Sequence, residues 1–249
     1  MAKVDRKKLL KQPDEFLTVS DHVVKWGRQN LKKLIVISSV AILAMVTTLG
    51  IQAYLNYRAS QASQALAMVF DDFVACMVGQ SDAARAEAAA KGLAQVVEQY
   101  GATHAGIQAR LALGELLLRQ GQAEKAEKAL LGLSEEPDLP APLAPLTLAA
   151  LGRSLEQRQK LAEAAEAYAN AAKAAGPQQA ALYRLDRARV LEAAGDKSQA
   201  EALYRALLRE SKDPTLMQTA RQRLAAMGLE PAAETPPAPP GPAPQPTAK

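Results

Sequence analysis

The stretch LALGELLLRQGQAEKAEKALLGLSEEP, residues 111–137, decides the fold. A small residue is needed where two helix backbones approach closely, and a glycine in a turn can adopt the left-handed conformation that ends a helix. The stretch supplies these residue types in order, followed by a bulky apolar residue and a proline: Gly114, Gly121, Ala126, Leu130 and Pro137. It therefore predicts a tightly packed pair of helices.

The same pattern recurs in residues 148–177 and 183–214. The corresponding positions of the three stretches are Gly114, Gly152 and Ala188; Ala126, Ala164 and Ala200; and Leu130, Tyr168 and Tyr204. We expect the bulky residue of each stretch to fill the gap against the next repeat. We also expect the proline at the end of each stretch to stop its second helix.

The spacing of these repeats is close to that of a known helical repeat. The first anchors are 38 and 36 residues apart, whereas the tetratricopeptide period is 34 residues. The extra residues can be placed in a proline-rich junction at 137–145. We therefore predict an all-α fold in which residues 58–228 form a tetratricopeptide-like α-hairpin solenoid. Another kind of α-hairpin stack is the alternative.

Further helices are predicted at both ends of the repeats. Residues 60–78 and 82–99 form an extra hairpin, and residues 215–227 a capping helix, because the last repeat would otherwise expose an apolar face. Arg221 and Arg223 are expected on the outer face of that cap. Residues 229–249 are rich in proline and cannot form a packed core, which predicts a disordered tail.

Residues 34–57 contain no charged side chain. As a helix they would be about 36 Å long, enough to cross a hydrocarbon core of about 30 Å. A cleaved signal peptide is the competing interpretation, but its apolar stretch is typically 7–15 residues and is followed by a small-residue cleavage site. The sequence favours a single uncleaved transmembrane helix.

The charge distribution predicts how this helix is oriented. Residues 1–33 carry nine Lys/Arg against four Asp/Glu, whereas the remaining 216 residues carry 21 Lys/Arg against 22 Asp/Glu. The positive-inside rule then keeps the basic N-terminal segment in the cytoplasm and places the repeats outside, which in a bacterium means the inner membrane and the periplasm. Residues 13–33 are either a short amphipathic helix on the membrane or a polar lead-in.

The repeat region has no basic bias and no nucleic-acid-binding motif, so no nucleic-acid partner is predicted. The single cysteine, Cys76, excludes an intramolecular disulfide and a cysteine-rich zinc site, and its neighbours favour a small buried side chain. His22 and His104 are expected on opposite sides of the membrane, with His104 in a solvated turn. No catalytic motif is found. We predict no enzyme activity, no cofactor, no metal and no small-molecule substrate.

A protein-binding groove is the remaining candidate site, because the first helices of stacked helix pairs line the concave side. The candidate residues on the three first helices are Leu111, Glu115, Leu118 and Arg119; Arg153 and Glu156; and Leu185, Arg189 and Glu192. Aliphatic patches mixed with both charge signs suit adaptable protein contacts. Ordinary solvated surface is the alternative interpretation of each residue.

The order of segments resembles that of the ancillary SecYEG translocon subunit family, whose repeat domain is shared with cell-division coordinator proteins. The stretches KKLLKQPDEFLTVSDHVVKW (7–26) and VVEQYGATHAGIQARLALGELLLRQGQAEKA (96–126) are similar to proteobacterial members. The resemblance covers roughly residues 13–227, and the proline-rich tail departs from it. No functional residue is transferred by it.

The resemblance implies an inner-membrane protein near the Sec translocon that hands exported proteins to periplasmic chaperones. Its implied partners are the SecYEG translocon, periplasmic chaperones or exported clients. The alternative is a scaffold for envelope assembly or cell division that uses the repeat groove and is unconnected with translocation.

Overall fold

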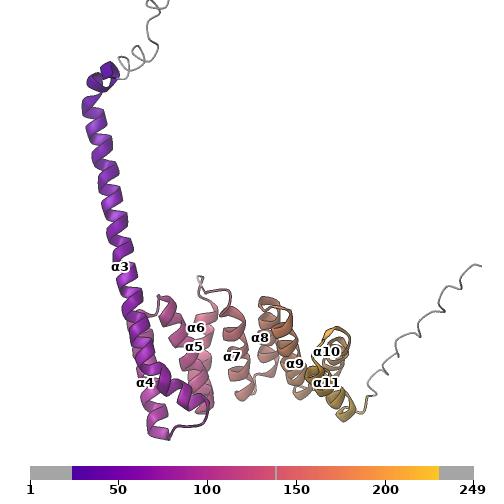
Figure 1. Ribbon diagram of the computed structural model, residues 1–249. Coiled ribbons are helices and arrows are strands. Elements are labelled where there is room, and N and C mark those ends of the chain that lie inside the picture. Colours follow the sequence, from indigo (N-terminus) through magenta and orange to yellow (C-terminus); the bar gives the residue numbers. More distant parts are fainter. Residues whose placement is uncertain (1–23, 138, 230–249) are drawn as a thin grey trace, which may run out of the picture. The chain divides into compact units, whose positions relative to one another are not determined.

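The computed structural model describes residues 24–137 and 139–229, and all regular structure in these residues is helical (Figure 1). The helices are α3 (Leu31–Met77), α4 (Ala83–Tyr100), α5 (His104–Arg119), α6 (Ala123–Ser134), α7 (Ala144–Gln157), α8 (Leu161–Ala174), α9 (Pro177–Ala193), α10 (Lys197–Glu210) and α11 (Pro214–Ala226). The chain forms two compact units, Met1–Arg58 and Ala59–Lys249. The predicted tail, and most of the predicted amphipathic segment, lie outside the described residues.

Helix α3 is a single element of 47 residues. It contains both the predicted membrane stretch and the first helix of the predicted extra hairpin, which the sequence suggested as separate segments. No glycine or proline lies between Tyr57 and Val78, and the residues that follow the apolar stretch, Arg58 and Ala59, are good helix formers. Helix α3 is long and apolar enough to cross a membrane, which makes it a candidate span.

From α5 onward the helices alternate as first and second members of three repeats, with α11 as a final helix (Figure 1). Each helix packs on its neighbours in sequence, and first helices also contact one another directly, α5 with α7 and α9 with α11. These contacts place the first helices together on one side of the stack, which we call the inner face. The predicted all-α solenoid is confirmed.

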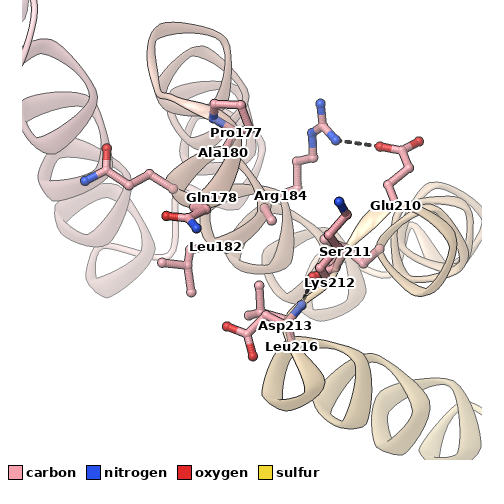
Figure 2. A pocket seen from close by; sticks show the side chains of 13 residues that line it. Pro177, Gln178, Ala180, Leu182, Arg184, Glu210, Ser211, Lys212, Asp213 and Leu216 are labelled. Atoms are coloured by element: carbon pink, nitrogen blue, oxygen red, sulfur yellow. Dashed lines mark hydrogen bonds and ion pairs between the residues drawn. The ribbon is translucent and has the colours of Figure 1, made fainter.

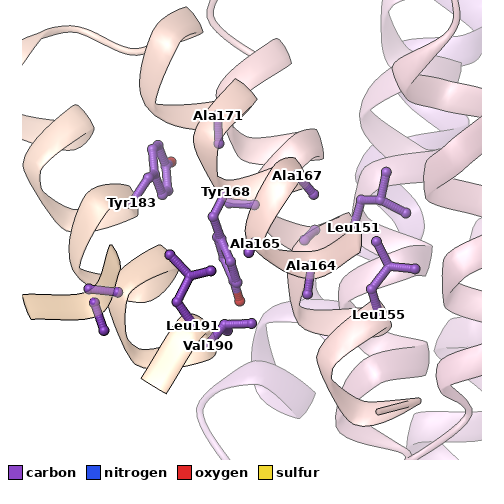
Figure 3. Packing of buried hydrophobic residues seen from close by; sticks show 14 of the residues in the cluster. Leu151, Leu155, Ala164, Ala165, Ala167, Tyr168, Ala171, Tyr183, Val190 and Leu191 are labelled. Carbon is purple, nitrogen blue, oxygen red and sulfur yellow. The ribbon is translucent and has the colours of Figure 1, made fainter. Parts of the chain in front are cut away.

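The small anchor residues are required by the close approach of the two helices in a repeat. A Cβ atom on Gly114 would lie 2.6 Å from Cδ2 of Leu130, and one on Gly152 would lie 3.0 Å from the ring of Tyr168. In both cases the bulky residue of the second helix packs directly against the glycine of the first. Figure 3 shows the Tyr168 ring beside Val190 and Leu191 of the next repeat, so this residue also seals the junction between repeats.

The turns within the repeats share one left-handed residue. Gly121 and Gly195 have φ angles of 72° and 85°, as predicted for the turn glycines. In the middle repeat the equivalent residue is Gln159, with a φ of 60°. A non-glycine residue rarely adopts this region, because its Cβ approaches the following carbonyl oxygen. The middle turn is therefore the strained one of the three.

Two of the three prolines at the ends of the repeats, Pro177 and Pro214, act differently from the prediction, whereas Pro137 lies in the loop after α6. Pro177 and Pro214 are the first residues of α9 and α11, whereas the preceding helices α8 and α10 end at Ala174 and Glu210. Proline suits the first helical position, since its backbone nitrogen needs no hydrogen bond there and its φ is already helical. These prolines start the next helix rather than stopping the previous one.

The buried side chains of the second unit form two clusters. The end of α3 packs on α4 and on one side of α5, through residues that include Leu66, Leu93 and Leu116. Cys76 belongs to this cluster and is 3% exposed, as predicted for a small buried side chain. The second cluster runs from α5 to α11. Because α5 contributes to both clusters, it connects the first hairpin to the three repeats.

Candidate protein-interaction surface

The nine predicted groove residues lie on α5, α7 and α9, as expected for first helices. Leu118 is only 6% exposed and belongs to the core, so its side chain does not line an open surface. Leu111 and Leu185 are partly buried and pack against the same core. Of the nine, Arg119 and Arg153 are exposed. The aliphatic members of the predicted groove therefore contribute to packing more than to open surface.

The structure brings five of the six charged members together in ion pairs between neighbouring first helices, and Arg119 is not part of these pairs. Glu115 pairs with Arg153, and Glu156 accepts two hydrogen bonds from Arg189, one of them 2.7 Å long between Nη2 and Oε2. The third pair extends to the capping helix. Its members, Glu192 Oε1 and Arg223 Nη1, are 4.0 Å apart.

We call these three pairs the inner ion-pair ladder. The sequence placed Arg223 on the outer face of the cap, but the structure directs it to the inner face. The prediction for Arg223 was wrong because the orientation of α11 depends on how it stacks on α9. The sequence of one helix alone does not reveal this stacking.

Exposure differs between the two sides of the ladder. The glutamate side chains are 18–27% exposed, whereas their arginine partners are 35–49% exposed. The carboxylates therefore lie deeper, and the guanidinium groups cover them. Since a guanidinium has five N–H donors, an arginine in such a pair retains donors for a further acceptor.

Two ladder glutamates also accept a hydrogen bond from a buried tyrosine of their own repeat. Tyr204 Oη donates to Glu192 Oε2 at 2.8 Å, and Tyr168 Oη lies 3.5 Å from Glu156 Oε2. Burial raises the pKa of both tyrosine hydroxyls, so they act as neutral donors. In the first repeat Leu118 and Leu130 occupy the corresponding positions, and no polar pair is formed there.

The ion pairs of the ladder shift the pKa values of their own members. The hydrogen bond from Arg189 is the main cause that lowers the pKa of Glu156, against the opposing effect of burial. The same bond raises the pKa of Arg189. Asp186 lies next to this pair, 3.7 Å from Arg189, and burial raises the pKa of its carboxyl group. The middle of the inner face therefore holds a tightly coupled charge cluster.

Sequence reasoning overlooked two exposed leucines on the first helices. Leu146 on α7 and Leu182 on α9 are 40% and 47% exposed. They precede Arg153 and Arg189 by seven residues, or two helical turns, and therefore share the inner face with the ladder. Their spacing of 36 residues equals that of the anchors Gly152 and Ala188, and this signal could have identified them.

Leu182 borders a groove of about 820 Å³ between α9, the end of α10 and the start of α11 (Figure 2). Leu207 and Leu216 contribute apolar surface to it. An ion pair of 2.8 Å between Arg184 and Glu210 lies at its edge. The groove thus combines an aliphatic floor with a polar rim.

A family model described as a tetratricopeptide repeat-like domain matches residues 25–157, just over half of the chain. The chain belongs to this family. The matched region extends to the end of α7, and the helices that follow continue the same alternation and the same anchor pattern. Repeat-like domains of this family are generally interaction modules without catalytic activity. A search of curated proteins returned no match.

The predicted turn histidine, His104, lies outside the ladder. His104 is exposed, as predicted, but it is the first residue of α5 rather than part of a turn, because the hydroxyl of Thr103 caps the helix by accepting a 3.1 Å hydrogen bond from the Gly106 amide. Its ring lies 3.1 Å from Gln108 Nε2. Within residues 24–137 and 139–229, no group of three or more His, Cys, Asp or Glu side chains could hold a metal ion.

Proposed function

We propose that this chain is a membrane-anchored protein-interaction module whose inner face binds polypeptide segments. We further propose that it serves as an ancillary subunit of the Sec translocon, helping to pass exported proteins to periplasmic chaperones. The observation that carries the proposal is the pairing of two exposed leucines with an arginine-covered ladder on one face of the repeats.

The chemistry of this face suits an extended or partly folded chain. Burying a leucine side chain contributes roughly 1.5–3 kcal/mol, so Leu146 and Leu182 can act as apolar anchors even when partly covered beforehand. The guanidinium groups of Arg153 and Arg189 retain N–H donors for the carbonyl or carboxylate oxygens of a partner. A polypeptide that has just left a membrane pore exposes both apolar side chains and unpaired carbonyl groups.

The candidate span supports a position at the membrane. Helix α3 can cross a bilayer, and the basic residues before it favour a cytoplasmic N-terminus. In that orientation the repeats are held outside the cytoplasm, close to where exported chains emerge. A scaffold for envelope assembly or cell division would have the same topology but different partners.

Site-specific photocrosslinking in native membranes tests the binding face. A photoreactive residue replaces Leu146 or Leu182, with Leu131 as a matched control, because it is 44% exposed but lies on the second helix α6. We expect products with SecY, chaperones or exported chains at the two first-helix positions and at least fivefold less at Leu131. Equal yields at all three positions would refute the inner face as the binding surface.

The same experiment separates the two proposed roles. Products that contain envelope or division proteins, and neither SecY nor exported chains, would reject the translocon assignment while leaving the inner face intact. The topology is tested independently by adding a protease to spheroplasts. We expect the repeats to be digested, and their protection would contradict the proposed handover on the outer side.

A further inference from the structure

The groove beside Leu182 has a rim that offers mainly hydrogen-bond donors (Figure 2). Its two carboxylates already have partners within the groove. Glu210 accepts a 2.8 Å hydrogen bond from Arg184, and Asp213 accepts one of 2.8 Å from the Thr215 amide. Further N–H donors come from the exposed side chains of Gln178, Gln179 and Lys212. A ligand with apolar groups, many acceptors and few donors therefore suits this groove.

The chain itself contains a segment with this chemistry after α11. Seven of the eleven residues 236–246 are proline, and none is charged. Because proline has no backbone N–H, these residues carry eleven carbonyl acceptors but only four backbone donors. Proline-rich segments favour the extended polyproline II conformation, in which the backbone makes no internal hydrogen bonds. The segment therefore offers acceptors and apolar rings together.

The end of α11 leaves this segment within reach of the groove. Gly228, with a φ of 76°, follows α11, and the side chain of Leu229 packs back against the second cluster. Helix α11 has 13 residues and is about 20 Å long, and the groove lies at its start, beside Asp213 and Leu216. The seven residue steps from Leu229 to Pro236 cover up to about 23 Å. Residues 236–246 are therefore long enough and close enough to reach the groove.

We propose that residues 236–246 dock into this groove of their own chain in the polyproline II conformation. Their proline rings pack on Leu182, and their carbonyl groups accept hydrogen bonds from the donors on the rim. A segment this short binds weakly when it is free in solution. The short connection to α11 raises its effective concentration at the groove to the millimolar range. A stiff segment also loses little conformational entropy on docking.

The docking has a consequence for the inner face, which rests on the proposed function. Leu182 is one of the two apolar anchors proposed for partner polypeptides, and the docked segment covers it. A partner must then displace the segment before it can use this anchor. Because the docked segment is held weakly, it acts as a reversible competitor and not as a permanent block. The docking itself does not depend on the proposed function.

Disulfide formation within the full chain, in its native membrane, tests the docking. In a Cys76→Ala background, Gln178→Cys places a thiol on the rim of the groove, and Ala238→Cys places one in the proline-rich segment. On mild oxidation this pair should form an intramolecular disulfide, measured by mass spectrometry of the linked peptides. In the matched control Gln218→Cys replaces Gln178→Cys. Gln218 is also exposed and lies on α11, nearer to the start of the segment, but it does not line the groove. We expect at least fivefold less disulfide from the control.

A second pair of variants tests whether the groove itself holds the segment. Leu182→Asp added to the disulfide pair should lower its yield at least threefold. Leu131→Asp should leave the yield unchanged, because Leu131 is similarly exposed but lies on α6. Equal yields from Gln178→Cys and Gln218→Cys, or no effect of Leu182→Asp, would overturn the proposal. Disulfides found only between two chains, at twice the 26.5 kDa chain mass, would also overturn it.

Deletion of residues 230–249 tests the competition separately. It should raise photocrosslinking of partners at Leu182 at least twofold and leave the yield at Leu146 unchanged, because Leu146 lies on α7 and outside the groove. An unchanged yield at Leu182 would overturn the competition. The disulfide assay needs no partner, so it reports on the docking even if equal photocrosslinking at Leu131, Leu146 and Leu182 refutes the proposed function.

Discussion

The first repeat, α5–α6, and the two that follow it, α7–α8 and α9–α10, share one backbone arrangement but differ in chemistry at its centre. In the first repeat Leu118 of the first helix and Leu130 of the second are both buried and apolar. In the later repeats the same two positions, again twelve residues apart, hold a glutamate and a tyrosine. The two positions therefore change together from one repeat to the next.

The difference arises because a buried hydroxyl group requires a hydrogen-bond partner. Tyr168 and Tyr204 fill more volume than Leu130, but each brings a polar atom that requires a partner when buried. The glutamate supplies an acceptor, and its own charge is then held by an arginine, on the next repeat for Glu156 and on the capping helix for Glu192. One larger side chain thus leads to a chain of three groups that links neighbouring repeats, such as Tyr168, Glu156 and Arg189.

Truncation of the bulky residue gives the largest expected difference between the repeats. Tyr168→Ala should lower the free energy of unfolding by about 3–5 kcal/mol, as for other buried aromatic residues, and Leu130→Ala by about 2–4 kcal/mol. Tyr168 is the larger side chain, and its loss opens the junction with α9 as well as the contact with Gly152. Urea unfolding followed by circular dichroism measures both. A smaller loss for Tyr168→Ala than for Leu130→Ala would contradict this ranking and would show that the ring adds little to the junction with α9.

Removal of the hydroxyl alone separates the two tyrosine repeats. Tyr204→Phe should cost about 1–1.5 kcal/mol, because its 2.8 Å bond to the Glu192 carboxylate is lost and a partly buried acceptor is left with a distant Arg223. Tyr168→Phe should cost less than about 0.5 kcal/mol, since its contact with Glu156 is 3.5 Å long and Arg189 still satisfies that carboxylate. Equal losses in urea unfolding would contradict this ranking.

The sequence predicted those features that depend on one repeat. The small anchors at Gly114 and Gly152 and the left-handed turns at Gly121 and Gly195 each follow from local packing or backbone geometry, and the structure confirms them. The pairing of residues in the ladder could not be predicted in this way. Its partners are 31–38 residues apart, and their meeting depends on the angle at which one repeat stacks on the next.

The continuity of α3 was also missed, since a change from apolar to polar composition at Arg58 was interpreted as a boundary between elements. Composition determines the surroundings of a helix, but it does not end one unless glycine, proline or a capping residue intervenes. Leu146 and Leu182, by contrast, could have been found by extending the anchor spacing to exposed positions.

The ladder should make stability depend on pH in the acidic range. The folded-state pKa of Glu156 is lowered mainly by its hydrogen bond from Arg189, so its stabilisation is fully present above the ordinary glutamate pKa and is lost as the pH falls through the lower folded value. Between pH 6 and pH 3 the wild type should lose on the order of 0.5–1 kcal/mol more than Glu156→Gln, a partial effect because the pair is partly exposed. Urea unfolding at each pH measures it.

Glu163→Gln is the control for this pH dependence. Glu163 is 63% exposed and lies 3.8 Å from Lys160, which is a weak surface pair. Its substitution should leave the pH dependence of the wild type unchanged. If Glu156→Gln and Glu163→Gln behave alike, the acid sensitivity arises elsewhere in the molecule and the ladder does not contribute to it.

The smallest expected effect concerns the turns, where the middle repeat differs from the other two. Gln159→Gly relieves the strain of a left-handed residue that carries a Cβ, which should stabilise the protein by about 1 kcal/mol. The same change raises the entropy of the unfolded chain, which should destabilise the protein by about 0.4–1 kcal/mol. The net stabilisation should therefore be at most about 0.5 kcal/mol. Gly195→Gln, at the matching turn of the last repeat, introduces the strain and lowers the entropy of the unfolded chain. It should therefore destabilise the protein by a similar amount. Thermal unfolding of the two variants therefore should shift in opposite directions. Shifts of the same sign would mean that the turn residue makes contacts that differ between repeats, and that the three turns are not equivalent after all.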